Sequence, residues 1–140
     1  MRIWSWRMWQ TYLAVMGGGA VGVGARMFLS GWITGRYGHD FPWGTMVVNI
    51  AGCFLIGLLA GFSGPGSAVP PILRQVLAIG VLGGFTTYSS FSLQTISLVA
   101  NGQVLFAVAN AVATLVFCLL GTWAGLALGG GVLDVSHVSP

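Results

Sequence analysis

Ten consecutive residues inside a long apolar stretch carry much of the polar chemistry of this chain: Gly83-Gly84-Phe85-Thr86-Thr87-Tyr88-Ser89-Ser90-Phe91-Ser92. Two adjacent glycines followed by two β-branched threonines make a poor helix centre. A helix broken here would leave backbone carbonyls to be satisfied by protein, water or an ion, and a ring of carbonyls coordinates cations. The alternative is a continuous helix whose hydroxyls bond back to the i−4 carbonyl. The sequence leaves both interpretations open.

The aromatic and hydroxyl residues of this run suit an anion. Tyr88 and Phe91 are spaced i, i+3 and would share a helix face. Ring edges are electropositive and hydroxyls donate hydrogen bonds, so both can face an anion. Asn49 and Asn110 each offer two N–H donors inside apolar stretches, and ordinary packing or bonding between helices is the alternative for all four residues. Arg26 near the end of its stretch could line a watery vestibule that gathers anions.

Acidic residues are missing from the apolar stretches. The chain has only two, Asp40 and Asp134, in an expected loop and in the C-terminal tail. Cation pathways and proton-coupled carriers place carboxylates within the membrane, so donors without acids indicate an anion path. Cys53 and Cys118 fall in apolar runs and are interpreted as buried thiols rather than as a disulfide or a metal site. No cluster of acids, histidines or nucleophiles predicts an enzyme.

The overall composition is that of a membrane protein. Of 140 residues, 56% are hydrophobic and 5% are charged, against roughly 25% charged in soluble proteins. The five arginines are scattered singly, so they form no patch that could bind nucleic acid. We therefore expect an all-α integral membrane protein in contact with the lipid bilayer.

Four runs are long enough to cross a membrane, for which a helix needs about 20 apolar residues. They cover about residues 11–32, 43–62, 72–100 and 103–129, and make one four-helix domain over 1–140. Turn-forming residues separate them, in particular 63–67 and Asn101-Gly102, the second permitting only a tight hairpin, while Gly129-Gly130-Gly131 ends the last helix. Glycines spaced four apart, such as Gly18 and Gly22, predict close helix packing and an oligomer.

The arginines give little orientation bias. Arg2, Arg7 and Arg74 are expected on one side of the membrane, and Arg26 and Arg36 on or near the other. Three against two is a weak signal under the positive-inside rule. Such a chain can insert both ways, which predicts dual topology.

Three motifs together resemble the Fluc/CrcB family of fluoride channels. They are Gly18-Gly19-Ala20-x-Gly22-x-Gly24-Ala25-Arg26, Pro42-Trp43-Gly44-Thr45-x-x-x-Asn49-x-x-Gly52, and the run from Gly83 to Ser92. The resemblance covers about residues 18–94, and the fourth apolar run matches only weakly.

The resemblance implies a broken third helix and an antiparallel dual-topology homodimer in the inner (plasma) membrane, through which fluoride leaves the cytoplasm, which lowers its toxicity. It implies a structural, untransported Na⁺ held by the backbone carbonyls of Gly83 and Thr86, and a vestibule at Arg26. By motif position it assigns the anion pathway to these residues: Asn49, Tyr88, Ser90, Phe91, Thr114, Cys118 and Thr122.

Two positions depart from the family pattern, and three other functions fit the sequence less well. Tyr88 stands where the family usually has Phe, and Cys118 stands where Ser is expected. A small multidrug transporter works through a membrane-embedded Glu, which this chain lacks. A non-transporting structural or assembly subunit would not need a hydroxyl-rich broken helix, and a K⁺-type filter would need a carbonyl ladder that is missing.

Overall fold

A computed structural model describes residues 6–63 and 69–130, and this part of the chain is entirely helical. The elements in order are α1 (Trp6–Tyr37), α2 (Trp43–Gly61), α3 (Pro71–Gln75), the π-helix η1 (Val76–Leu82), α4 (Gly83–Phe85), α5 (Tyr88–Ala100) and α6 (Val104–Leu128).

Four helical stretches are long and apolar enough to span a membrane, which confirms the predicted four-helix membrane architecture. They are Met8–Tyr37, Trp43–Gly61, Pro71–Ala100 and Val104–Leu128. The first is longer than the predicted 11–32, because α1 continues through Gly35 and ends only before Gly38, whose φ is +86°. Of the predicted turns, residues 64–67 and Gly131 lie outside the described part.

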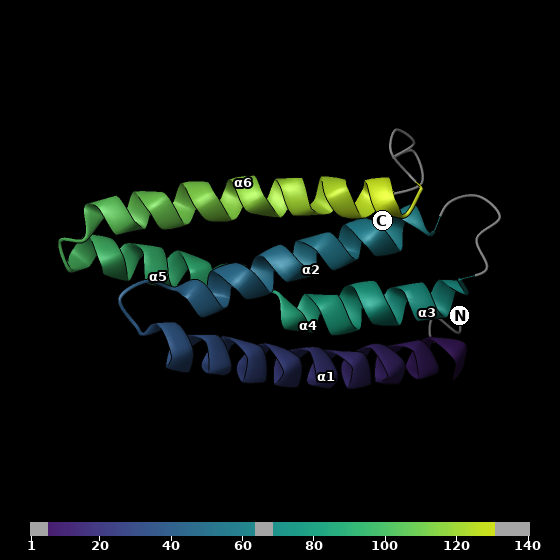
Figure 1. Cartoon of the computed structure of the whole chain (residues 1–140). Helices are drawn as coiled ribbons and strands as arrows, with labels where there is room; N and C mark the ends of the chain where they lie inside the picture. The colour runs from purple at the N-terminus through teal and green to yellow at the C-terminus, as the bar shows by residue number, and fades with distance from the viewer. Residues whose placement is uncertain (1–5, 64–68, 131–140) are drawn as a thin grey trace, which may run out of the picture.

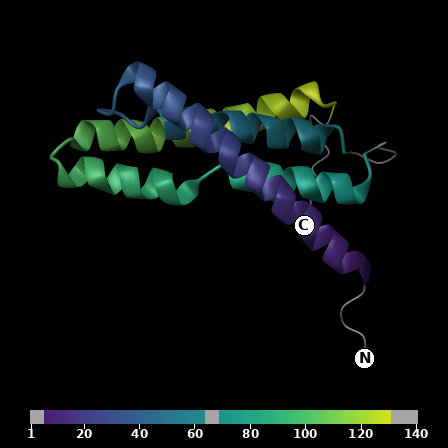
Figure 2. The same ribbon diagram turned by 90° about the horizontal axis from the view of Figure 1, so that it is seen from below.

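The helices form two packed groups (Figure 1). One group is α2 against α6, with α5 beside α6; the other is α1 against η1 and α4. Figure 2 shows α1 crossing the rest of the bundle obliquely. The α1–α2 connection and the tight turn at Asn101-Gly102 lie at one end of the bundle, and α3 lies at the other (Figure 1). Arg36 and Arg74 are therefore at opposite ends.

Glycine allows both groups to pack at backbone distance. A Cβ at Gly22 would collide with the carbonyl oxygen of Val81 in η1, and a Cβ at Gly57 would collide with the carbonyl oxygen of Thr122 in α6. The close helix packing predicted from glycine spacing thus occurs within one chain. These two glycine faces are consumed there, so the expected oligomer needs a different surface.

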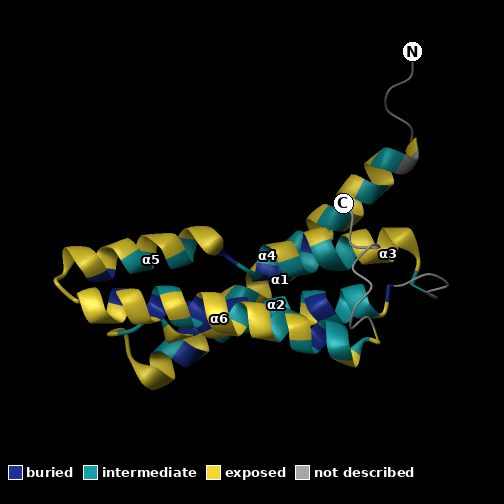
Figure 3. Cartoon of the chain, turned by 90° about the horizontal axis from the view of Figure 1, so that it is seen from above, coloured by how far each residue is buried: buried dark blue, intermediate teal, exposed yellow. Residues whose placement is uncertain are grey.

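The distribution of polarity is inverted relative to a soluble protein. Many large apolar side chains are exposed, and Figure 3 shows exposed positions along α1, α5 and α6. In the described part of the chain, the buried polar residues are Thr45, Asn49, Ser63, Thr87, Asn110 and Thr114. Lipid solvates apolar side chains but offers polar groups no hydrogen bonds, so polar groups are satisfied inside the bundle. Two of these residues bond across helices: Asn49 on α2 to Thr87, and Asn110 on α6 to Thr95 on α5.

Candidate functional site

The helical conformation of the third span stops for two residues. Phe85 ends α4, Thr86 (φ −81°, ψ 158°) and Thr87 (φ −152°, ψ 108°) are extended, and Tyr88 begins α5. Thr86 Oγ1 donates to the Leu82 carbonyl at 3.0 Å, which is the i−4 bond expected of a continuous helix. The bond forms, but it closes the last turn of α4 instead of carrying the helix forward.

This interruption removes the helical donors of the last carbonyls before it, including those of Gly83 and Thr86. In a continuous α-helix, the Thr87 N–H would donate to the Gly83 carbonyl, and the Ser90 N–H to the Thr86 carbonyl. Instead, Thr87 N–H donates to Asn49 Oδ1 at 2.8 Å and Ser90 N–H donates to Thr87 Oγ1 at 3.2 Å. The Thr86 carbonyl accepts from Arg26 Nη1 at 3.4 Å. Gly83 and Thr86 thus each present a carbonyl released from the helical ladder.

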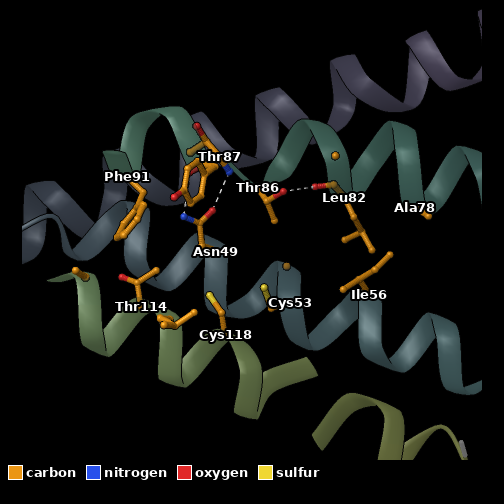
Figure 4. A pocket seen from close by; sticks show the side chains of 15 residues that line it. Asn49, Cys53, Ile56, Ala78, Leu82, Thr86, Thr87, Phe91, Thr114 and Cys118 are labelled. Carbon is orange, nitrogen blue, oxygen red and sulfur yellow. Dashed lines mark hydrogen bonds between the residues drawn. The ribbon is translucent and has the colours of Figure 1, made fainter. Parts of the chain in front are cut away.

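Asn49 on α2 holds the interruption in place. Its Oδ1 accepts from Thr87 N–H, and its Nδ2 donates to the Thr87 carbonyl at 3.0 Å, so the two residues form a reciprocal pair (Figure 4). Both residues are buried. One Asn49 N–H is used in this pair, which leaves the other for a ligand. Asn49 is a predicted site residue, whereas its partner Thr87 was not predicted from the sequence.

Thr87 also starts the second half of the span. Its Oγ1 accepts from Ser90 N–H as a helix N-cap, donates to Ser90 Oγ at 3.0 Å and lies 3.3 Å from Ser89 Oγ. Ser, Thr, Asp and Asn are the preferred N-cap residues because a short side-chain oxygen reaches the free N–H groups. In the sequence, the only local indication of this N-cap was a threonine shortly after the glycine pair.

A cavity of about 620 Å³ lies beside the interruption. Its walls come from α2, η1, α4, α5 and α6, and its lining includes most of the predicted site residues: Asn49, Gly83, Thr86, Tyr88, Phe91, Thr114 and Cys118 (Figure 4). The Tyr88 and Phe91 rings lie 5.5 Å apart, centroid to centroid, at a tilt of 49°. Tyr88 is 80% exposed in the single chain, so one side of this cavity is open.

Three predicted residues lie away from the cavity wall. Ser90 is engaged with Thr87, as described above. Thr122 Oγ1 donates back to the Cys118 carbonyl at 3.1 Å, so its hydroxyl is used within α6. Arg26, expected at a vestibule, places its guanidinium against the Thr86 carbonyl at the interruption.

Asn110 joins helices instead of lining the cavity. Its Nδ2 donates to Thr95 Oγ1 at 2.8 Å, which links α6 to α5, and its Oδ1 accepts from Thr114 Oγ1 at 3.4 Å. The residue is 1% exposed. Both asparagines therefore bond between helices, but only Asn49 also lines the cavity.

A sequence model of the family described as CrcB-like protein, Camphor Resistance (CrcB), matches residues 13–126. The chain belongs to this family. The match includes most of α6, which extends well past the residues 18–94 that carried the resemblance. Family membership and four apolar spanning helices together make this chain a multi-pass membrane protein.

Several curated relatives are similar over nearly their whole length. One from Rhodospirillum rubrum is 52% identical over 117 residues, covering 82% of this chain and 91% of the relative. One from Citrifermentans bemidjiense is 45% identical over 115 residues, covering 82% and 91%. One from an Anaeromyxobacter species is 47% identical over 116 residues, covering 83% and 92%. Each of the three is named fluoride-specific ion channel FluC.

Proposed function

We propose that this chain is a fluoride-selective channel of the plasma membrane that lets fluoride leave the cytoplasm and so lowers its toxicity. The single observation that carries this beyond the similarity to fluoride channels is the chemistry of the cavity. Its polar lining offers amide and hydroxyl donors, and it contains no Asp or Glu among the described residues. An anion stripped of water needs such donors, and a carboxylate there would repel it.

An anion that passes through this cavity would need hydrogen-bond donors along its path. The second N–H of Asn49 and the ring edges of Tyr88 and Phe91 are the groups that would replace the water around the anion. The Thr114 hydroxyl would join them only on leaving Asn110 Oδ1, to which it donates. Cys118 would take part as a weak donor. Ser90 and Thr122, which the resemblance also assigns to the pathway, would need to exchange their present partners to join it.

We also propose that the interruption at Thr86 and Thr87 is the functional break of the third helix and that it holds a structural Na⁺. Two observations support the fit: the carbonyls of Gly83 and Thr86 have lost their helical donors, and both residues line the cavity. Carbonyl oxygen is a suitable ligand for a hard cation. A Na⁺ without a nearby carboxylate would supply a fixed positive charge that favours anions. Arg26 donates to the same Thr86 carbonyl, and its positive charge would repel a Na⁺ bound there.

The assembly we propose is an antiparallel homodimer. Two carbonyls from one chain are too few to coordinate an ion, whereas two chains would contribute four. The open side of the cavity at Tyr88 supports a partner there, and the nearly balanced arginines support insertion in both directions.

Efflux from liposomes that hold only this purified chain tests the function. Fluoride-loaded liposomes should empty when the protein is present, and chloride-loaded ones should not. Phe91→Ile keeps bulk in the cavity but removes the electropositive ring edge, and should slow fluoride efflux. Equal rates for fluoride and chloride would contradict selectivity, and no efflux at all would favour a structural or assembly subunit.

Labelling of single cysteines tests the dual topology. A cysteine placed at the exposed His39, in a chain lacking Cys53 and Cys118, should react with an impermeant reagent from both sides of the membrane. Reaction from one side only would show a fixed orientation, and an antiparallel mate would then have to be a different chain.

A further inference from the structure

Cys53 and Cys118 lie together in the cavity wall, although sixty-odd residues separate them in the sequence. Cys53 is on α2 and Cys118 on α6, both are free thiols, and both line the cavity. Their side chains face the same stretch of cavity wall, where α2 and α6 pack against each other. Figure 4 shows the two sulfur atoms on the α2–α6 side of the cavity.

The packing of α2 and α6 explains why the two thiols meet. The helices run in the same direction, and Gly57 packs at backbone distance against Thr122. Residues four positions earlier lie on the same helix faces, one turn away. That step leads from Gly57 to Cys53 and from Thr122 to Cys118. The relative position of the pair is thus set by a close backbone contact between α2 and α6, one turn away.

This pair is suited to a narrow class of ligand. Thiolate sulfur is a soft donor that selects soft metal ions such as Cu⁺. No group of three or more Cys, His, Asp or Glu side chains occurs in the described residues, so a tetrahedral zinc site cannot be completed here. Soft d¹⁰ ions such as Cu⁺, Ag⁺ and Hg²⁺ are satisfied by two sulfur ligands in a line.

We propose that Cys53 and Cys118 form a two-thiolate site for a soft cation of the Cu⁺, Ag⁺ and Hg²⁺ class, and that the bound metal blocks the cavity. On binding, both thiols lose their protons to water and two metal–sulfur bonds form, with no change of oxidation state. The metal then bridges α2 and α6 one helical turn from Asn49 and Thr114, where the cavity offers its donors. The blocking part rests on the proposed function, because it requires this cavity to carry the anion.

Intact-protein mass spectrometry with Hg²⁺ as the probe tests the site itself. The full-length wild-type chain should take up one metal with the loss of two hydrogens. Cys53→Ser and Cys118→Ser should each bind through one thiol and lose the metal to a competing monothiol at concentrations lower by about a hundredfold or more, which is the usual gain from a second tethered ligand. Cys53→Ala replaces the serine variant if a hydroxyl disturbs the α2–α6 packing.

Three results would overturn the site. They are two metals on each wild-type chain, one metal shared between two chains, and wild-type retention by both single variants. The chain has two cysteines in all, so no other thiol can produce the expected result.

Fluoride efflux tests the block. Hg²⁺ should stop efflux by the wild type, and a dithiol chelator should restore it. For Cys53→Ser, measured against its own untreated rate, the Hg²⁺ concentration for half block should rise at least about tenfold, again because the second tethered thiol is lost. One bound metal per chain with undiminished efflux would overturn the block but not the site. Failure of untreated wild type to pass fluoride would contradict the proposed function, and mass spectrometry would still decide the metal site.

Discussion

The two halves of the third span are held by different chemistry. The half before the interruption, η1 and α4, packs on α1 by backbone contact, as Gly22 against the Val81 carbonyl illustrates. The half after it, α5, is tied to α6 by a side-chain bond between Asn110 and Thr95. One half depends on the absence of side chains and the other on specific polar ones.

The interruption therefore lies between a half-span that packs on α1 and a half-span that is bonded to α6. Thr86 belongs to the first half through its bonds to the Leu82 carbonyl, and Thr87 belongs to the second half as the cap of α5. Asn49 on α2 binds Thr87 through both atoms of its amide. Substitutions in either half of the span, or at the bond between Asn49 and Thr87, should therefore disturb the site. Each kind of substitution should change a different measured property.

The largest effect should follow Asn49→Asp. The carboxylate can still accept from Thr87 N–H, but it cannot donate to the Thr87 carbonyl, and it puts negative charge in an anion path. We expect fluoride efflux to fall by roughly a hundredfold, which corresponds to about 2.7 kcal/mol of barrier at about 1.36 kcal/mol for each tenfold.

Asn110→Asp is the matched control for that change. It removes the same kind of donor from a buried amide, but at the α5–α6 bond and outside the cavity lining. Its cost should fall mainly on thermal stability in detergent. Equal losses of efflux in correctly folded samples of the two variants would show that the position of Asn49 at the break has no special importance.

Gly22→Leu should weaken the first half of the span. A Cβ there meets the Val81 carbonyl oxygen, and the amide nitrogen of Phe85 is 2.9 Å away. Overpacking of this kind costs about 1–3 kcal/mol, visible as a lower unfolding temperature. Gly24→Leu, two residues further along α1, meets nothing within 4 Å and should unfold like the wild type; if both variants lose the same stability, glycine packing is not the cause.

A smaller effect is expected in the second half. Thr87→Ala removes the cap of α5 and should cost about 1 kcal/mol of stability, while Thr87→Ser keeps the accepting oxygen and should cost less. Proteolysis or hydrogen exchange at the start of α5 measures the difference. Identical protection in the two variants would mean that the hydroxyl of Thr87 does not hold the helix end.

The smallest predicted effect concerns Arg26. Its guanidinium lies 3.4 Å from the Thr86 carbonyl oxygen, and like charges repel, so Arg26→Gln should lower the Na⁺ concentration needed to stabilise the dimer by a few-fold. Arg36→Gln, at the exposed end of α1, should leave that concentration unchanged. A rise in the required Na⁺ for Arg26→Gln would show that the arginine assists the ion.

The sequence predicted which region of the chain forms the site better than it predicted the hydrogen bonds within the site. The glycine pair and the threonine pair have poor helix propensity, so they predicted where an interruption would fall but left a continuous helix equally open. Which two residues leave the helix was open, since Thr86 makes the back-bond of a continuous helix and the chain still departs after it. The spacing of apolar residues does not indicate which residues leave the helix.

Partners far apart in sequence were beyond prediction. Nothing local says that Asn49 pairs with the Thr87 backbone while Asn110 bonds to Thr95, because the two asparagines have similar apolar surroundings in sequence. Likewise, glycine spacing predicted close helix contacts, but it did not predict that α1 packs against η1 and α2 against α6. The π-helix at Val76–Leu82 has no sequence signal that we can identify.

The shared direction and register of α2 and α6 restrict how this chain can change in length. Asn49 with Thr114, Cys53 with Cys118 and Gly57 with Thr122 are separated by the same interval in sequence, so one inserted residue in either helix would turn every later position by about 100°. Gly57 would then no longer meet the Thr122 carbonyl, and a side chain would take its place in the contact. Insertions should survive in the connection after α2 or in the tail after α6, and be lost between Asn49 and Gly57 or between Thr114 and Thr122.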